Sequence, residues 1–233
     1  MLYWPTCALN PKETHANPVP FTRGGGRSLN GIERATRTDK GFWSIELTGI
    51  VVRHGTGSAR AWNALRTGLN GRAGLIVVPA KSWDTAPYAS GRFEPRVRTV
   101  HDDGTPFSDG TTYSQGAIDI EMAEHAAIGS SVVTLRRLMA ADDLSGIRFS
   151  YNHALYETGP AIEVEGDLWT VPLFPSVRAT IPAGASLECD QPTCLVRLAE
   201  DRGMDLPQGK RGFTEASVVF VEAVDHWNDL AAA

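Results

Sequence analysis

Residues 42–53 read FWSIELTGIVVR, and this stretch decides the fold. Apolar and polar side chains alternate in its first half, which is the pattern of a strand with one buried face. Residues 58–69 follow a different period, because Trp62, Leu65 and Leu69 recur at the spacing of one helix face. The sequence therefore predicts a strand over 42–53, followed by one amphipathic helix at about 58–69.

Short strand-like segments occupy much of the remaining chain. Each is an apolar run or an alternation of apolar and polar residues, and they cover 75–79, 118–122, 132–138, 147–151, 154–156, 168–173, 185–188, 194–198 and 216–223. Asn152 and His153 separate two of these segments, which is a hairpin signal. One helix among many strands excludes doubly wound α/β folds. The expected fold is mainly β: two packed antiparallel sheets, as in a sandwich or split barrel, with one flanking α-helix and long loops.

The chain is expected to form one domain with two extensions. Residues 1–30 are predicted to be an extended N-terminal arm, because prolines and a glycine run interrupt any regular element there. Residues 31–225 are predicted to be a single β-rich domain that contains a long loop at 81–116. Residues 226–233 are predicted to be a C-terminal tail. A loop as long as 81–116 is uncommon in a compact domain and is usually functional or ordered by a partner.

The predicted arm carries three large aromatic residues, Tyr3, Trp4 and Phe21. A free tail does not need such side chains, so the arm is expected to lie across a surface of its own chain or of a neighbour. These three residues are therefore candidates for a subunit interface.

Composition and charge exclude several classes of protein. The 233 residues include 22 Lys and Arg against 27 Asp and Glu, a net charge of −5, which argues against a nucleic-acid-binding face. The apolar runs are too short to cross a membrane as a helix, and no signal peptide is expected. Three cysteines leave at least one thiol unpaired. Cys189 and Cys194 flank a Pro-containing turn that could fit a disulfide, but reduced thiols are favoured.

No catalytic motif was found among the common ones. The chain lacks GxSxG, GxxxxGK[ST], GxGxxG and HExxH. Asp102 and Asp103, followed by Asp109, could supply oxygen ligands to a hard cation, but the spacing favours simple turns. The sequence therefore predicts no enzyme, no cofactor and no metal, with these aspartates as the weak metal candidates.

Several strings in the chain resemble distal tail proteins of long-tailed bacteriophages, a family that shares its fold with the tail tube. The resemblance covers about residues 20–225. It is carried by GGRSLNG at 25–31, TDKGFW at 38–43, AWNALR at 61–66, VP at 78–79, HDDGTPFSDG at 101–110 and QPTCLVRLA at 191–199.

The resemblance implies a structural virion subunit that forms a ring, a homohexamer, at the distal end of the tail. Its partners would be copies of itself, the tail tube protein and the hub or baseplate proteins, with assembly in the host cytoplasm. DNA would pass through the lumen without specific binding, so the lumen face is expected to be acidic. The protein would not insert into a membrane. Strands 42–53 and 216–223 are expected to belong to sheets that continue across subunits.

A second hypothesis is a carbohydrate-binding, receptor-recognising β-sandwich module of a phage tail. Loop 81–116 contains four aromatic residues, Trp83, Tyr88, Phe93 and Tyr113, which could serve as stacking platforms for sugar rings. Trp83, Tyr88 and Phe93 are equally candidates for a subunit interface. This chain differs from that family in its C-terminal half, where no linker separates a receptor-facing domain from the rest of the chain.

Overall fold

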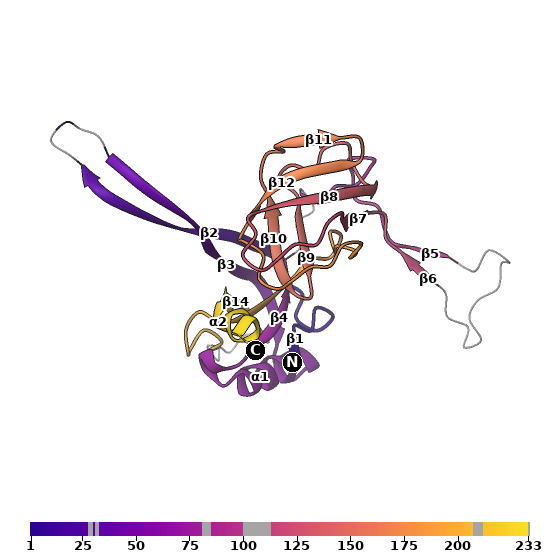
Figure 1. Ribbon diagram of the computed structural model, residues 1–233. Helices are drawn as coiled ribbons and strands as arrows, with labels where there is room; N and C mark the ends of the chain where they lie inside the picture. The colour runs from indigo at the N-terminus through magenta and orange to yellow at the C-terminus, as the bar shows by residue number, and fades with distance from the viewer. Residues whose placement is uncertain (28–29, 31–32, 81–84, 100–112, 207–211, 233) are drawn as a thin grey trace.

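The computed structural model describes residues 1–27, 30, 33–80, 85–99, 113–206 and 212–232 (Figure 1). Within these ranges the chain is mainly β, with two six-stranded sheets and two α-helices. The predicted fold class is therefore confirmed.

The first sheet gathers strands from both ends of the chain. In spatial order they are β1 (Leu2–Tyr3), β4 (Ile76–Pro79), β13 (Thr193–Leu198), β14 (Phe213–Glu222), β3 (Glu33–Arg53) and β2 (Glu13–Arg27). Neighbours are antiparallel except β1 and β4, which run parallel. The N-terminus is thus paired into the sheet as an edge strand.

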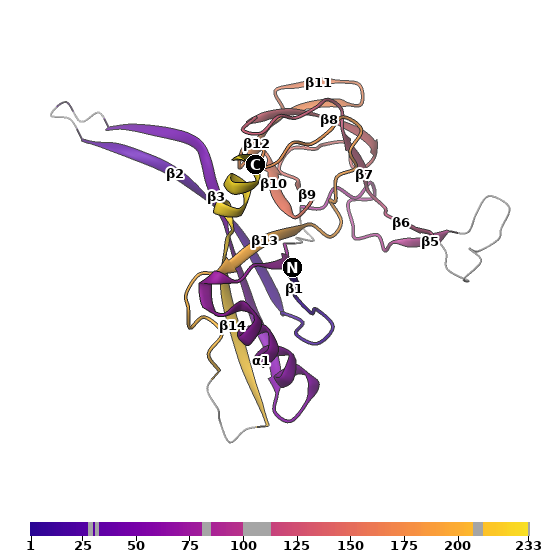
Figure 2. The same ribbon diagram turned by 60° about the horizontal axis from the view of Figure 1, so that its bottom comes forward.

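The second sheet is built from the middle of the chain. Its strands are, in spatial order, β7 (Asp119–Met122), β8 (Val132–Met139), β12 (Leu168–Phe174), β10 (Ala154–Thr158) and β9 (Arg148–Tyr151), and β11 (Glu163–Glu165) also pairs with β12. Asn152 and His153 form the turn between β9 and β10, with φ of 48° and 69°, so the predicted hairpin is confirmed. A separate pair, β5 (Val97–Thr99) and β6 (Tyr113–Gln115), extends from this part of the molecule (Figure 2).

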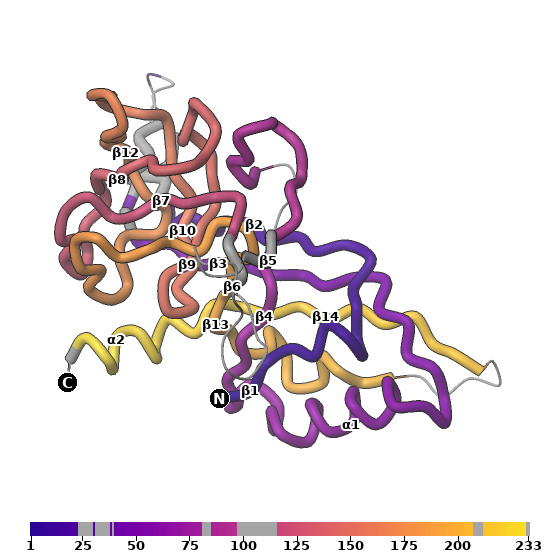
Figure 3. The backbone as a smooth tube through the Cα atoms, turned by 90° about the vertical axis from the view of Figure 1, so that its right-hand side faces the viewer, coloured from indigo at the N-terminus to yellow at the C-terminus, as the bar shows by residue number. Residues whose placement is uncertain are grey.

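The predicted helix is α1 (Gly57–Leu69), which is followed by a single 3₁₀ turn, η1 (Gly71–Ala73). Its buried residues are Trp62, Leu65 and Leu69, the stripe that the sequence indicates. Figure 3 shows α1 alongside the first sheet and away from the second. The helix therefore covers one face of the first sheet.

Two apolar clusters form the core. In β4, Ile76 and Val78 belong to the cluster that contains the α1 side chains, whereas Val77 between them belongs to the cluster of the second sheet. Strand β13 divides in the same way, with Cys194 in the first cluster and Leu195 in the second. These central strands are buried on both faces, which explains their uninterrupted apolar runs.

The N-terminal residues predicted to form a separate arm are part of the first sheet and its core. Trp4 and Leu9 are buried in the first cluster, and residues from Glu13 onwards form β2, which pairs with β3. Pro18 and Pro20 do not break β2 because they lie two residues apart on an edge strand, where both missing N–H groups can face away from the partner.

The described residues of the predicted C-terminal tail are also part of the folded body. Residues from Val224 to Ala232 form a second helix, α2, and Trp227 is buried in the second cluster. The prediction missed it because the segment is short, with Trp227 as its one strongly buried aromatic residue. Trp227 of α2 therefore contributes to the core of the second sheet.

The strands predicted to belong to sheets that continue across subunits, β3 and β14, lie inside the first sheet. β3 and β14 pair with each other from Ser44 to Arg53, and each has another strand on its far side over part of this length. The edges of the first sheet are β1 and β2, whereas the end strands of the second sheet's main path, β7 and β9, are bridged to residues 186–188, through Glu121 with Ser186 and Ser150 with Glu188. A continuation of the first sheet across subunits would therefore use β1 or β2.

Candidate interaction surfaces

A long hairpin formed by β2 and β3 projects from the body. Strand β14 pairs only with residues 44–53 of β3, whereas β2 pairs with β3 out to Glu33. Residues 18–27 and 33–43 therefore leave the sheet as a two-stranded ribbon, which we call the long hairpin (Figure 1). Two strands without further cover are marginally stable in water, so a surface of this kind suits contact with another molecule.

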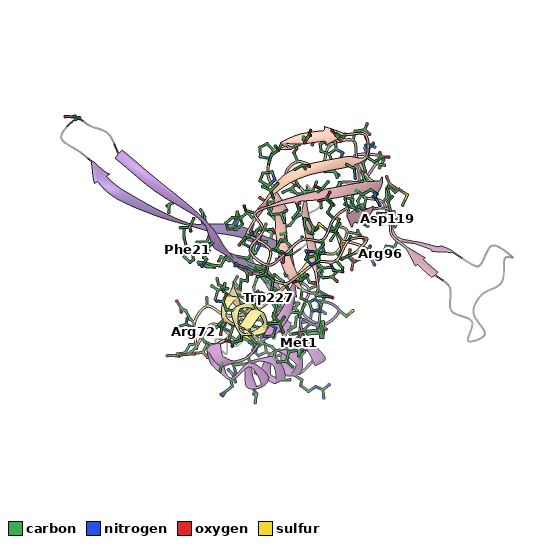
Figure 4. The ribbon with its side chains drawn as sticks, viewed as in Figure 1. Met1, Phe21, Arg72, Arg96, Asp119 and Trp227 are labelled. Atoms are coloured by element: carbon green, nitrogen blue, oxygen red, sulfur yellow. The ribbon has the colours of Figure 1, made fainter. Side chains whose placement is uncertain are left out.

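The predicted interface residue Phe21 lies on the long hairpin (Figure 4). Its side chain is 51% exposed, and its ring contacts that of Phe42 on the opposite strand at a centroid distance of 5.6 Å. An aromatic pair of this kind stiffens the ribbon and still presents apolar surface.

A buried ion pair fixes the root of the long hairpin. Arg178 donates from Nε to Oε1 of Glu222 at 2.8 Å and from Nη2 to Oε2 at 3.1 Å, and Nη2 also donates to the carbonyl of Gly41. The backbone N–H of Trp43 donates to Glu222 at 3.1 Å. Burial raises the pKa of Glu222, and the contacts with Arg178 partly oppose this effect. The carboxylate of Glu222 in β14 therefore holds two groups at once. One is the side chain of Arg178, and the other is the backbone of Trp43 at the base of the long hairpin.

Close packing completes the same root. A Cβ added at Gly41 would overlap the ring of Phe174 in β12. Trp43 lies edge-on to Phe174 at 5.7 Å and donates from Nε1 to the carbonyl of Leu155 at 2.8 Å. The hairpin therefore leaves the body in a direction set by tight contacts with the second sheet.

The second projection, β5 and β6, has a charged root. Arg96, which directly precedes β5, donates from Nε to Asp190 at 2.6 Å and from Nη2 to both oxygens of Glu188 at 2.8 Å. Tyr88 donates its hydroxyl proton to Asp190, whose side chain is 6% exposed. Burial, followed by this hydrogen bond, raises the pKa of Tyr88. Figures 1 and 2 show this projection on the side of the body opposite the long hairpin.

The structure separates the predicted interface residues into exposed and buried ones. Tyr3 is 59% exposed and Phe93 is 51% exposed, as an interface role requires. Trp4 and Tyr88 are 5% and 3% exposed, so both are core residues and the prediction is wrong for them. Trp4 is buried because it packs edge-on against Trp62 and Phe220 and donates Nε1–H to the carbonyl of Leu9.

The remaining candidates lie outside the described residues. These are Trp83 and the aspartates 102, 103 and 109, together with the side chain of Tyr113. Sequence reasoning also missed the charged contacts at the roots of the two projections, which we call the anchors: Arg178 with Glu222, and Arg96 with Asp190. Arg178 and Glu222 are 44 residues apart and Arg96 and Asp190 are 94 residues apart, and no local pattern links such partners.

Two kinds of reactive site, a metal centre and a nucleophilic thiol, can be checked in the described residues. No group of three or more His, Cys, Asp or Glu side chains among them could hold a metal ion. Cys189 and Cys194 are buried free thiols whose pKa values are raised chiefly by burial, which keeps them from acting as nucleophiles.

No described helix is both long and apolar enough to span a bilayer.

The distinctive features of the described chain are therefore two anchored projections from a two-sheet body. No protein-family model matches the chain, and no curated protein matches it.

Proposed function

We propose that this protein is a structural subunit at the distal end of a long-tailed phage tail, where six copies form a ring that joins the tail tube to the hub or baseplate. The observation that supports this role is the pair of projections with anchored roots. The long hairpin has no further strand on either side, so it adds little to the stability of an isolated chain, whereas a ring subunit can use such a ribbon to contact its neighbour.

Anchoring strengthens the proposal. The Arg178–Glu222 pair and the packing of Gly41 against the second sheet orient the long hairpin before any partner binds. A projection whose direction is already fixed loses less conformational entropy on assembly than a flexible one. The exposed Phe21 then offers apolar area for burial in the contact.

The sheet edges offer a second mode of contact. Edge strands present unpaired backbone groups that can pair with another chain, and β2 at one edge of the first sheet is 15 residues long. Continuation of a sheet through β2 of one copy gives the heterologous contact that closes a ring.

The carbohydrate-binding alternative is weaker. Of its four loop aromatics, Tyr88 is buried and bonded to Asp190, so its ring is not available for stacking. Phe93 is exposed, but its ring already lies edge-on to Tyr88 at 5.6 Å. A glycan array with no binding, before and after Phe93→Ala, would remove this alternative.

The proposed function is tested by electron microscopy and native mass measurement of the purified protein, alone and with tail tube or hub proteins of a long-tailed phage. Six-fold rings, alone or on addition of a partner, are expected. The matched variant replaces residues 22–38 with a two-residue turn, which shortens the long hairpin and leaves its root intact; it should fold but lose the rings. A chain that remains a monomer with every tail component would refute the proposal.

A further inference from the structure

One surface of the molecule carries a cluster of exposed arginines although the chain is acidic. No Asp or Glu occurs between Glu46 and Asp84. Within this stretch, the exposed arginines at and beside α1, with the exposed His54 and Asn63, define what we call the basic face; the arginines are Arg53, Arg60, Arg66 and Arg72.

The guanidinium groups of the basic face form no ion pair among the described residues, although Asp201 accepts a hydrogen bond from the backbone N–H of Arg72 at 3.0 Å. Arginines elsewhere in the described chain are mostly engaged, and those with an ion pair are Arg96, Arg136, Arg137, Arg148, Arg178, Arg197 and Arg202. The contrast is unexpected for a chain with a net charge of −5, which has more than enough carboxylates to pair every arginine. The guanidinium charges of the basic face are therefore not neutralised by ion pairs within the described part of the chain, and they can bind an acidic partner.

The same surface is hollowed. A cavity of about 200 Å³ opens beside α1, and its lining includes His54, Asn63 and Arg66. His54 is held in place by a 3.0 Å hydrogen bond between its Nε2 and the hydroxyl of Thr214. A guanidinium, an amide and an imidazole around one hollow provide hydrogen-bond donors for a carboxylate.

A complementary surface exists on the same chain. Exposed carboxylates gather around β11 and the turn before β9, and we call them the acidic edge: Asp142, Asp143, Glu163, Glu165 and Asp167. Arg137 draws this edge together, because it contacts Asp142 at 2.6 Å and Asp167 at 3.3 Å. Glu163 and Glu165 have no ion-pair partner within the described part of the chain.

The two surfaces lie at opposite ends of the molecule. In Figure 1, α1 is at the bottom and β11 is at the top, with both sheets between them. They cannot neutralise each other within one chain, but they can do so between two chains arranged head to tail. Each surface also carries exposed apolar side chains: Ile162 and Val164 at the acidic edge, and Phe213, which pairs with Arg53, beside the basic face.

We propose that the basic face of one copy binds the acidic edge of the next, with a carboxylate of β11 entering the hollow beside α1. This inference rests on the proposed function in one respect, that the chain assembles with itself. It adds the identity of the two surfaces that meet. Contact between two different patches is the heterologous type that generates rings or stacks.

A second copy explains the basic face better than DNA does. Outside residues 47–83 the chain carries a large excess of carboxylates, so its overall field repels a polyanion. The exposed Phe213 also adds an apolar element that phosphate contact does not require, whereas a protein edge carrying Ile162 and Val164 can bury it.

The test is a charge swap on the full chain. One variant is Arg60→Glu/Arg66→Glu and the other is Glu163→Arg/Glu165→Arg, and self-association is measured by sedimentation velocity at about 50 mM and about 500 mM salt. Each variant alone should associate about tenfold or more weakly than the wild type. An equimolar mixture of the two should recover association, because the reversed faces complement each other in both directions. Lys12→Glu/Arg92→Glu changes the net charge as much as the first variant does and should behave as the wild type.

The outcomes separate this inference from the proposed function. Rings that persist in both reversed variants would overturn the contact and leave the proposed function standing. Absence of self-association in the wild type at low salt would also overturn the contact, whereas the proposed function would still depend on the tube or hub partner. Binding of a DNA duplex that is lost in Arg60→Glu/Arg66→Glu, with association unchanged, would assign the basic face to nucleic acid instead.

Discussion

Removal of the cation at the root of the long hairpin should destabilise the whole protein. In Arg178→Met, the carboxylate of Glu222, whose side chain is 0% exposed, keeps the hydrogen bond from Trp43 but loses its counter-charge. Removal of one partner of a buried pair costs about 3–5 kcal/mol, because the other charge stays buried and uncompensated. For a chain of this size, that corresponds to a fall of about 6–20 °C in the melting temperature.

The assay is urea unfolding followed by tryptophan fluorescence, at several pH values. In the folded wild type, the pKa of Glu222 is already raised by burial, so this group stabilises the fold more as pH falls through its folded pKa. Without Arg178 the pKa rises further, because the group that opposes the effect of burial is gone. The stability deficit of Arg178→Met should therefore be largest at neutral pH and should shrink as the pH is lowered.

Two controls make the result decisive. Arg178→Met/Glu222→Gln removes both charges and should recover part of the loss, since a buried pair replaced as a unit is often near neutral. Arg178→Lys keeps the charge but not the bidentate geometry and should lie between the wild type and Arg178→Met. A deficit below about 1 kcal/mol at neutral pH, or one that grows on acidification, would refute the assignment of this pair as the anchor.

Two further predictions concern packing and thiol chemistry. Gly41→Ala should cost about 1–3 kcal/mol because its Cβ would overlap a ring of the second sheet, whereas Gly57→Ala, whose Cβ would meet nothing within 4 Å, should change stability by less than about 0.5 kcal/mol; equal unfolding midpoints for the two variants would contradict this account. In the native protein a thiol reagent should label the exposed Cys7 rapidly and leave the buried Cys189 and Cys194 unmodified until urea is added; rapid labelling of all three native thiols would show that this part of the core is open.

Local patterns predicted the elements whose signals are local. The spacing of Trp62, Leu65 and Leu69 identified α1, and Asn152-His153 identified the β9–β10 turn, because both signals depend on neighbours a few residues away. The fold class followed from the same periodicities.

The long hairpin was not predictable in the same way. Pro18 and Pro20 argue against a strand unless the strand is known to lie at an edge, and edge position is a property of the assembled sheet. The residues of the anchors are far apart in sequence. Tyr88 and Arg96, for example, contact Asp190 only in the folded chain. The basic face is different: the absence of Asp and Glu over residues 47–83 is visible in the sequence, but only the structure shows that its arginines lie exposed, with no ion pair of their guanidinium groups among the described residues.

The positions of the anchors separate stability from assembly in this molecule. Arg178 and Glu222 are buried and face the core, whereas Phe21 and the basic face are exposed and take no part in either anchor. A substitution at an anchor therefore acts on assembly through the direction and stiffness of a projection, and it weakens folding at the same time. A substitution on an exposed surface changes the contact alone. Any variant that loses assembly while its unfolding midpoint is unchanged must therefore map to an exposed surface, and the charge swap is designed to meet that condition.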